Sequence, residues 1–596
     1  MSYAVEKQLA EVAKTIKKIL SVAELPAIEI ANSKFDADFA LPCFTLARDL
    51  HKKPQEIAEQ IVVGLNHPVI AKAEAKAGFV NLWLSDSALG SALGEIVTKP
   101  TYGAQKLLDK QKILIEVYST NPFKDLHIGH AYNSIVGDTL ANIFKLGGAD
   151  LHRVSYGGDV GLHVGKSMWA ILRYLEGDIS KLDVVKSGDR PAFLSRMYVE
   201  GAGQYEEDSI IRQQIDVLAR QSFVQDDAFF KQVYEICRQW SFDYIHKMIK
   251  KMGSQLAERE YWENEADKLG RQIVETHIGD VFERSEGAIV FKGETYGLHT
   301  RVFITSHDTT LYEARDLGLM QLKEQEYNPD KSYYLTAEEQ RDYFKVVLKA
   351  AQLSLPELKD KSVNISTGTV KLSTGKMSSR TGKVVNIEGL FKELSEALKA
   401  RGAEEDNLQA GIVGALRYAM LKVRIGGDII FDINESISLE GNSGPYLQYA
   451  HARGRSILAK LADSSSTEKS SSSSSHPRLD WESSKKKSSL LTGSPIGVGD
   501  DETGEKTFVD FTADEHKLAI KVLEYPTITA KAISELAPHH ICNYLYELTQ
   551  QFNRFYEHNR IIGDPRQNQR AELVNSYCQV LENGLGVLGI PAPERL

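Results

Sequence analysis

At 596 residues the chain is too long for one hydrophobic core, and we expect several domains. Hydrophobic residues make up 42% and charged residues 26%, with no apolar run long enough to cross a bilayer and no N-terminal secretory signal. The net charge of −10 does not exclude a nucleic acid, because binding depends on local clusters of Lys and Arg. We therefore expect a cytoplasmic protein without a membrane partner.

The four cysteines are widely scattered and form no CxxC pair; they are Cys43, Cys237, Cys542 and Cys578. Neither a zinc site nor a disulfide framework is indicated, and we expect buried thiols in a reducing compartment.

Residues 1–104 are expected to form a small α+β domain. Pro54 suits the first turn of a helix, and Ile57, Ile61 and Leu65 follow it at helical spacing. Residues 78–84 alternate like a strand, and the turn-rich sequence PTYG at 100–103 marks the boundary.

Residues 105–404 follow a strand, loop, helix pattern. Residues 112–118 are typical of a buried strand, which leads through a loop at 119–126 into a helix from His127 to about Phe144. This order indicates an α/β domain with a Rossmann-type parallel sheet. Charged helical segments at about 166–290 predict an insertion, after which residues 301–305 are expected to resume the sheet.

Residues 405–596 are expected to form an all-α domain, with helices through 416–421 and 539–559. Low-complexity sequence at about 463–508 interrupts it, including six consecutive serines and the lysines at 485–487. Such a segment buries too little apolar surface to offset the entropy of ordering, so we expect a disordered insertion. A basic arm that touches RNA is the alternative.

The first chemical motif is His127-Ile128-Gly129-His130 at the start of the long helix. The two histidines are three residues apart and share one helix face. The helix N-terminus offers free N–H groups and a positive dipole to phosphate, and Gly129 lets an adenine ring approach the backbone. Alone, the motif could equally be a solvated helix cap.

A second motif lies about 250 residues downstream, in the glycine-bounded loop GKMSSRTGK at 375–383. Its three cations and several hydroxyls could close on a triphosphate and neutralise the charge of departing pyrophosphate. Alone, it could equally be an ordinary basic surface turn.

Together the two motifs resemble the HIGH and KMSKS signatures of class I aminoacyl-tRNA synthetases, and the resemblance narrows to arginyl-tRNA synthetases over nearly the whole chain. The supporting segments are EVYSTNPFKDLHIGH at 116–130, GDVG at 158–161, YEARD at 312–316 and YLQYAHAR at 446–453. The last of these is similar to the family's anticodon-domain signature. The resemblance implies that ATP and arginine form an adenylate, whose arginyl group is then transferred to tRNA-Arg.

The resemblance also implies roles for individual residues. Those expected to act on ATP are Lys124, His127, Gly129, His130, Lys376, Met377, Ser378, Ser379 and Arg380. Asp316, Tyr312 and Glu116 would receive the guanidinium, and Asn121, Ser119 and Gln340 would hold the α-amino end. A planar cation with five donors requires such fixed acceptors, although each residue alone could be an ordinary surface or strand residue.

One departure from the KMSKS pattern concerns its second lysine, whose place Ser379 takes here, followed by Arg380. Arginyl enzymes that lack this lysine often carry one just before HIGH, where this chain has Lys124. We therefore expect Lys124 to supply the missing charge; Arg380 or Lys383 is the alternative. Mg²⁺ is expected to arrive with ATP, and no dedicated metal site is expected.

For tRNA, the resemblance implies that Phe79 stacks on a base at the outer corner of the molecule and Asn81 reads it. Tyr449 and Arg453 are the expected anticodon-side contacts, with plain core and surface roles as the alternative. A monomer is expected. The rival interpretations are another class I synthetase, a small-molecule nucleotidylyltransferase, and an inactive relative that only binds RNA.

Overall fold

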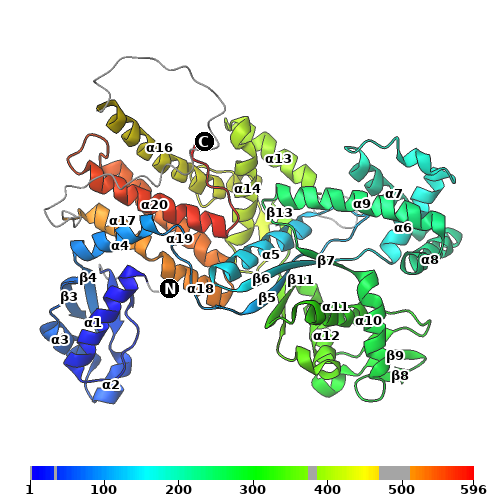
Figure 1. Ribbon diagram of the computed structural model, residues 1–596, viewed down its shortest axis with the longest axis horizontal. Helices are drawn as coiled ribbons and strands as arrows, with labels where there is room; N and C mark the ends of the chain where they lie inside the picture. The colour runs from blue at the N-terminus through cyan, green and yellow to red at the C-terminus, as the bar shows by residue number, and fades with distance from the viewer. Residues whose placement is uncertain (1–2, 32–36, 374–385, 469–509, 596) are drawn as a thin grey trace.

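Five parallel strands form the centre of the molecule in the computed structural model, which describes residues 3–31, 37–373, 386–468 and 510–595 (Figure 1). Their order across the sheet is β12 (Ser362–Thr367), β11 (Lys331–Ala337), β5 (Lys112–Tyr118), β6 (Asp150–Gly157) and β7 (Arg259–Trp262). The order of connection reverses between β5 and β11. A doubly wound sheet binds its ligand at such a reversal, beyond the carboxyl ends of the strands.

The predicted strand at 301–305 forms but does not resume this sheet. It is β10 (Arg301–Ile304), which pairs antiparallel with β9 (Ala288–Phe291), itself paired with β8 (Glu283–Ser285). In its place, β7 lies in the main sheet, inside the segment expected to be an insertion. A short strand-like segment indicates a strand but not its partner, and here β10 pairs with β9, the strand that precedes it in the chain.

Helices cover the sheet and extend beyond it. The first group is α5 (Ile128–Leu146), α10 (Glu263–Thr276), α11 (Tyr312–Tyr327) and α12 (Arg341–Ser354). A separate bundle, at the right in Figure 1, contains α6 (Leu162–Leu175), α7 (Arg190–Glu207), α8 (Ser209–Val224) and α9 (Ala228–Lys251). This bundle has its own apolar core, which includes Phe123 from the loop after β5.

The N-terminal part is a four-stranded sheet with helices, as its sequence pattern predicts. The sheet order is β1 (Glu29–Ile30), β2 (Phe39–Pro42), β4 (Phe79–Leu84), β3 (Ile70–Lys76). Its helices are α1 (Ala4–Leu20), α2 (Phe44–Leu50), α3 (Pro54–Gly64) and α4 (Asp86–Thr98). It contacts the C-terminal helices, where His516 Nε2 lies 2.8 Å from Asp38 Oδ1.

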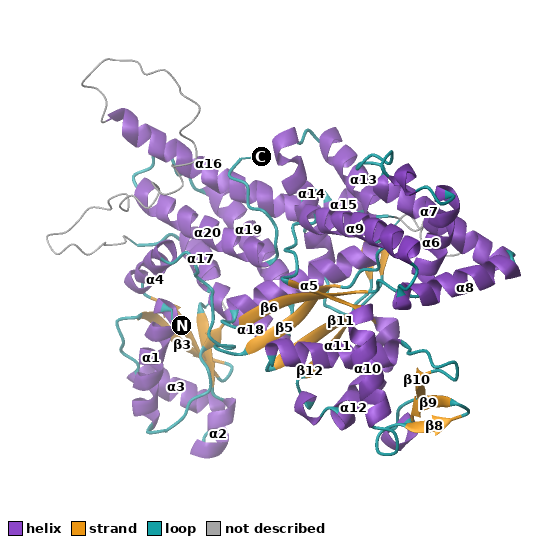
Figure 2. Ribbon diagram, turned by 45° about the vertical axis from the view of Figure 1, so that its right-hand side comes forward, coloured by secondary structure: helices purple, strands orange, loops and turns teal. Residues whose placement is uncertain are grey.

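The C-terminal part is helical, as predicted (Figure 2). After α13 (Ile387–Ala400), its helices are α14 (Glu405–Leu421), α15 (Ile433–Ser436), α16 (Gly444–Glu468), α17 (Ala513–Leu523), α18 (Tyr525–Glu535), α19 (Pro538–His558) and α20 (Gln567–Val587). A short parallel pair, β13 (Val370–Leu372) and β14 (Ile429–Phe431), joins it to the region after the main sheet. Because α16 runs to Glu468, the start of the segment expected to be disordered is helical; residues 469–509 lie outside the described chain.

Two simpler expectations concern membranes and cysteines. Within the described ranges, no helix is long and apolar enough to cross a membrane. All four cysteines are buried and free, as expected for unpaired thiols.

A single buried side chain, Arg417 of α14, joins the helical part to the helix that carries the two histidines. Its exposed fraction is 0%, and its five N–H donors all have acceptors. The acceptors are Asp138 Oδ2 at 2.8 Å, Thr139 Oγ1 at 3.0 Å, Ser254 Oγ at 2.9 Å, Met252 O at 3.3 Å and Leu588 O at 2.6 Å. These acceptors come from α5, from the end of α9 and from the residues after α20.

We expect Arg417→Met to destabilise the protein strongly. The variant removes the closer of two cations at the buried Asp138 carboxylate, since Arg153 Nε remains 3.8 Å from Oδ1, and it leaves the other acceptors of Arg417 unpaired; together we expect a cost of about 3 kcal/mol. Arg455→Met is a matched control, because Arg455 pairs with the exposed Glu594 at 3.2 Å and such pairs contribute about 1 kcal/mol or less. The measurement is the Tm of the first thermal unfolding transition of each variant. Equal Tm values for Arg417→Met and Arg455→Met would contradict the proposed role of Arg417.

Candidate active site

The predicted site residues meet at the carboxyl ends of β5 and β11. Ser119 and Asn121 lie in the loop after β5, while Gln340 ends the 3₁₀ turn η3 (Glu338–Gln340) after β11. Ser119 and Gln340 are exposed and Asn121 is half-buried. The side chains expected to hold an α-amino group therefore lie at one edge of the sheet.

The two histidines face each other across the first turn of α5. His127 is the N-cap, and its ring centroid lies 3.7 Å from that of His130. Each Nδ1 accepts a backbone N–H: His127 Nδ1 from Gly129 at 3.1 Å, and His130 Nδ1 from His127 at 3.2 Å. The Gly129 N–H is therefore already hydrogen-bonded within the motif.

Both imidazoles are neutral in this arrangement. Burial lowers the pKa of His127, and burial together with His127 and Lys124 lowers the pKa of His130 to about 3. With Nδ1 accepting, the single proton of each ring lies on Nε2. The pair therefore offers two Nε2–H donors and no positive charge, so the charge that a triphosphate requires must come from another residue.

Lys124 is the cation nearest to this pair along the chain. Its ammonium is half-buried, and burial lowers its pKa. The charge also lowers the pKa of His127, His130 and His163, so it lies within electrostatic reach of all three rings. No described carboxylate forms an ion pair with it.

The second motif lies outside the described residues, including Lys376, Met377, Ser378, Ser379 and Arg380. The chain is described again from Asn386, which forms an antiparallel bridge with His127. The Ile387 N–H donates to Leu126 O at 3.0 Å. The start of the chain described after this motif is therefore attached to the start of the histidine motif.

A group of buried carboxylates surrounds Tyr156 near the carboxyl end of β5, and most are already paired with cations. Glu116 Oε1 lies 2.5 Å from Lys323 Nζ, and Glu263 Oε2 lies 2.5 Å from Arg315 Nη1. The other two pairs are Asp159–Arg238 at 3.1 Å and Glu313–Arg301 at 3.2 Å. The expected guanidinium ligand Glu116 is thus shared with a lysine that sequence spacing did not reveal.

Asp316 differs from these groups because no described cation pairs with it. Its Oδ2 accepts a hydrogen bond from the Tyr343 hydroxyl at 2.5 Å. Burial, together with the nearby Glu116 carboxylate, raises its pKa to about 7 despite that hydrogen bond. Asp316 is therefore the carboxylate whose charge an incoming cation would stabilise most.

Close helix packing brings this group together. A Cβ on Gly270 of α10 would lie 1.9 Å from Ala314 O of α11, so only glycine permits this approach. Gly158 has a similar role, since its Cβ would lie 2.4 Å from Asn121 Oδ1 and 3.1 Å from Glu263 Oε1. The predicted GDVG segment therefore leaves room for the expected amino-acid ligand Asn121.

Several residues that contact or surround these carboxylates were given no role from the sequence, namely Tyr156, Glu263, Arg315, Lys323 and Tyr343. The Tyr156 hydroxyl is buried with no hydrogen-bond partner among the described residues. Burial and the nearby Glu263 and Asp316 raise its pKa well above the usual value. The predicted Tyr312 is 57% exposed, and the Arg315 guanidinium lies 4.5 Å from its ring centre.

The residues expected to meet RNA lie in three environments. Tyr449 is 40% exposed, and the Arg453 guanidinium lies 4.9 Å from its ring centre and 5.8 Å from that of Tyr556. Phe79 is half-buried against Phe44, with ring centres 5.1 Å apart. Asn81 is only 2% exposed, so its amide is closed to solvent in this conformation.

A parallel sheet with this strand order, with a histidine-capped helix after its first strand, defines the catalytic domain of a class I aminoacyl-tRNA synthetase. Comparison with family models agrees. The description "tRNA synthetases class I (R), catalytic domain" matches residues 93–434, "Arginyl tRNA synthetase N terminal domain" matches 4–84, and "DALR anticodon binding domain" matches 447–596.

The chain belongs to the arginyl family of class I tRNA synthetases, because the catalytic family model covers more than half of it. Among similar proteins, an arginine–tRNA ligase of Clostridium acetobutylicum is 28% identical over 98% of this chain and 99% of its own. An arginine–tRNA ligase of Lactococcus lactis is 27% identical over 99% of this chain and 100% of its own. The fold is similar to that of the Thermus thermophilus arginyl-tRNA synthetase, with a TM-score of 0.72, 22% identity and coverage of 99% and 100%.

Proposed function

We propose that the protein is an arginine–tRNA ligase, which joins arginine to the 3′ end of tRNA-Arg at the expense of ATP. The observation that carries this assignment is Asp316, a carboxylate without a cation partner among paired carboxylates near the carboxyl end of β5. A guanidinium supplies the missing charge permanently and with several donors. The exposed Tyr312 and the shared Glu116 complete the guanidinium site.

In the first step, the arginine carboxylate attacks the α-phosphorus of ATP and pyrophosphate leaves with its bonding electrons. Nε2–H of His127 and of His130 donate to phosphate oxygens, and Lys124 with Lys376 neutralises the charge on the departing group. Gln340, Ser119 and Asn121 orient the α-amino end. None of these residues forms a covalent bond to the substrate, so positioning and electrostatics carry the catalysis.

In the second step, a hydroxyl of the terminal tRNA ribose attacks the carbonyl carbon of the adenylate, and AMP leaves. Tyr449 and Arg453 suit an unstacked anticodon base, because aromatic faces and guanidinium planes stack on bases. Phe79 offers a similar face on the N-terminal part. A role for Asn81 in reading the same base requires a local opening of its surroundings.

The other expectations are retained as part of this proposal. The nucleotide substrate is the Mg²⁺ complex of ATP, the protein acts as a monomer, and its location is the cytoplasm. We retain the domain limits at 104/105 and 404/405. The insertion expected at about 166–290 is shortened, because β7 belongs to the main sheet, and the serine-rich segment expected at about 463–508 is limited to the residues after α16.

Aminoacylation with a panel of amino acids tests the assignment. We expect charging of tRNA-Arg with arginine alone, with roughly 10⁴–10⁵-fold discrimination against uncharged analogues such as citrulline, because an unpaired buried carboxylate opposes them. ATP–pyrophosphate exchange with and without tRNA shows whether activation waits for tRNA. Preference for another amino acid would indicate a different class I specificity, and tRNA binding without charging would indicate an inactive relative.

The raised pKa of Asp316 predicts how arginine binding depends on pH. Below pH 7 the free protein holds a proton on Asp316, which arginine must displace, so the KM for arginine rises about tenfold per pH unit of acidification. Above pH 7 the KM is constant with respect to this group.

Two variants separate Asp316 from its neighbour Glu263, whose pKa burial also raises to about 7. We expect Asp316→Asn to give a high KM for arginine without the acid-side slope, and Glu263→Gln to retain the slope. A slope that persists in Asp316→Asn would assign the titration to another group.

Lys124 and Arg380 are the two candidates for the positive charge that the missing KMSKS lysine would supply. Comparing Lys124→Ala with Arg380→Ala tests which of them supplies it. We expect Lys124→Ala to slow ATP–pyrophosphate exchange by about 10²-fold, the usual cost of one lost transition-state contact, and Arg380→Ala to have a smaller effect. Near-wild-type exchange in Lys124→Ala, with strong loss in Arg380→Ala, would transfer the role to the loop.

A further inference from the structure

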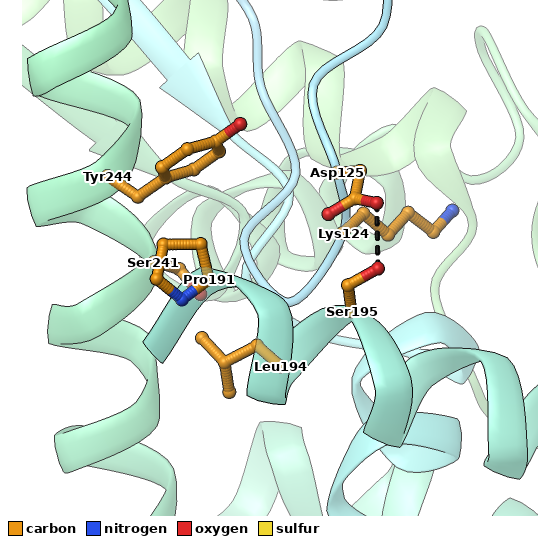
Figure 3. Close-up of a pocket in the computed structure, with 7 residues that line it drawn as sticks. All are labelled: Lys124, Asp125, Pro191, Leu194, Ser195, Ser241 and Tyr244. Atoms are coloured by element: carbon orange, nitrogen blue, oxygen red, sulfur yellow. Dashed lines mark hydrogen bonds between the residues drawn. The ribbon is translucent and has the colours of Figure 1, made fainter. Parts of the chain in front are cut away.

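Helix α7 of the inserted bundle contacts the loop that precedes His127. Ser195 Oγ donates a hydrogen bond to Asp125 Oδ2 at 2.7 Å, and the two side chains face each other beside a small pocket (Figure 3). Pro191 and Leu194 of α7 line the same pocket. The bundle therefore packs directly against a loop of the proposed active site.

Tyr198 extends this contact to Lys124. It lies three residues after Ser195, on the same face of α7. The Lys124 Nζ lies 5.3 Å from the centre of the Tyr198 ring, within the range of a cation–π interaction. Two consecutive loop residues, Lys124 and Asp125, thus contact two side chains on one face of one helix.

The loop is also fixed on its other side, at Phe123. The Phe123 ring is completely buried, and the Phe123 backbone N–H donates to Ser241 Oγ of α9 at 3.0 Å. The backbone of Phe123 is in the left-handed region, with φ of 65°. Because the loop backbone is anchored there, the remaining freedom of Lys124 lies in its flexible side chain, whose ammonium meets the Tyr198 ring.

An aromatic face suits a lysine that must later bind phosphate. A carboxylate would hold the ammonium but would neutralise it and occupy its N–H donors. A ring attracts the cation through its quadrupole and leaves both the charge and the donors available. Among the described residues, Lys124 has this ring and no carboxylate as its charge partner.

We propose that Tyr198 is a positioning residue for the adenylation step, which holds the Lys124 ammonium beside the two histidines before ATP binds. The inference rests on the proposed role of Lys124 at the ATP phosphates. It makes the inserted bundle a part of the nucleotide site, although no bundle residue need touch the nucleotide.

The test is ATP–pyrophosphate exchange in Tyr198→Leu, Tyr198→Phe and Lys124→Ala. Loss of a cation–π contact corresponds to about a 2- to 30-fold effect, so we expect Tyr198→Leu to lower kcat/KM for ATP by that factor with KM for arginine unchanged. Tyr198→Phe keeps the ring face and is expected to restore the rate. The double variant Lys124→Ala/Tyr198→Leu is expected to be no slower than Lys124→Ala.

Tyr205→Leu serves as the matched control. Tyr205 is also on α7 and its ring lies 4.3 Å from Lys166 Nζ, so this variant removes the same kind of contact away from the loop. We expect wild-type exchange. Loss equal to that of Tyr198→Leu would overturn the proposal in favour of general weakening of the bundle.

The remaining outcomes separate this proposal from the one on which it rests. Wild-type exchange in Tyr198→Leu, with impaired Lys124→Ala, overturns the role of Tyr198 alone. Wild-type exchange in Lys124→Ala overturns the role of Lys124 and with it this inference. Equal loss in Tyr198→Leu and Tyr198→Phe shows that the hydroxyl is needed, which also overturns it.

Discussion

The buried guanidinium of Arg417 connects the helix that carries the two histidines to the helical C-terminal part. Asp138 lies on α5 itself, Met252 and Ser254 close the inserted bundle, and Leu588 follows the last helix. A planar group with five fixed donors admits only one arrangement of these acceptors. Arg417 therefore helps to fix the position of the histidines relative to the C-terminal helices, together with the apolar core that α5 shares with them and the bond from Asn142 Nδ2 to Val587 O at 3.1 Å.

The group of buried carboxylates follows a second constraint, the cost of burying charge. Glu116 and Glu263 have internal cations, which reduces that cost. Asp316 accepts a hydrogen bond from the hydroxyl of Tyr343 but has no cation partner among the described residues, and its pKa is raised. The ionised Asp316 carboxylate is unfavourable while the site is empty and is stabilised when a cation binds, so the site favours a permanently charged ligand. In our proposal, this is why the protein needs no editing domain for uncharged analogues.

Local pattern in the sequence was enough to predict the strand at 112–118, the helix after His127 and the helical C-terminal part. It was not enough to choose the partner of a short strand. The main sheet contains β7 and β11, whereas residues 301–305 were expected to continue it. The pairing of Glu116 with Lys323 spans 207 residues, and no spacing rule reaches that far. The roles of the predicted site residues stay predictions, including those of the loop around Lys376.

The bonds of Arg417 also constrain how the chain can fold during synthesis. Its partner Asp138 precedes it by 279 residues and its partner Leu588 follows it by 171. The helix with the histidines is made early on the ribosome, but its anchor is complete only after Leu588 has emerged. A nascent chain therefore carries its nucleotide-binding motif for most of translation without the contact that fixes it, and contacts of such high sequence separation form slowly. The histidine motif is therefore fixed in its final position only after the last helix of the chain has been made.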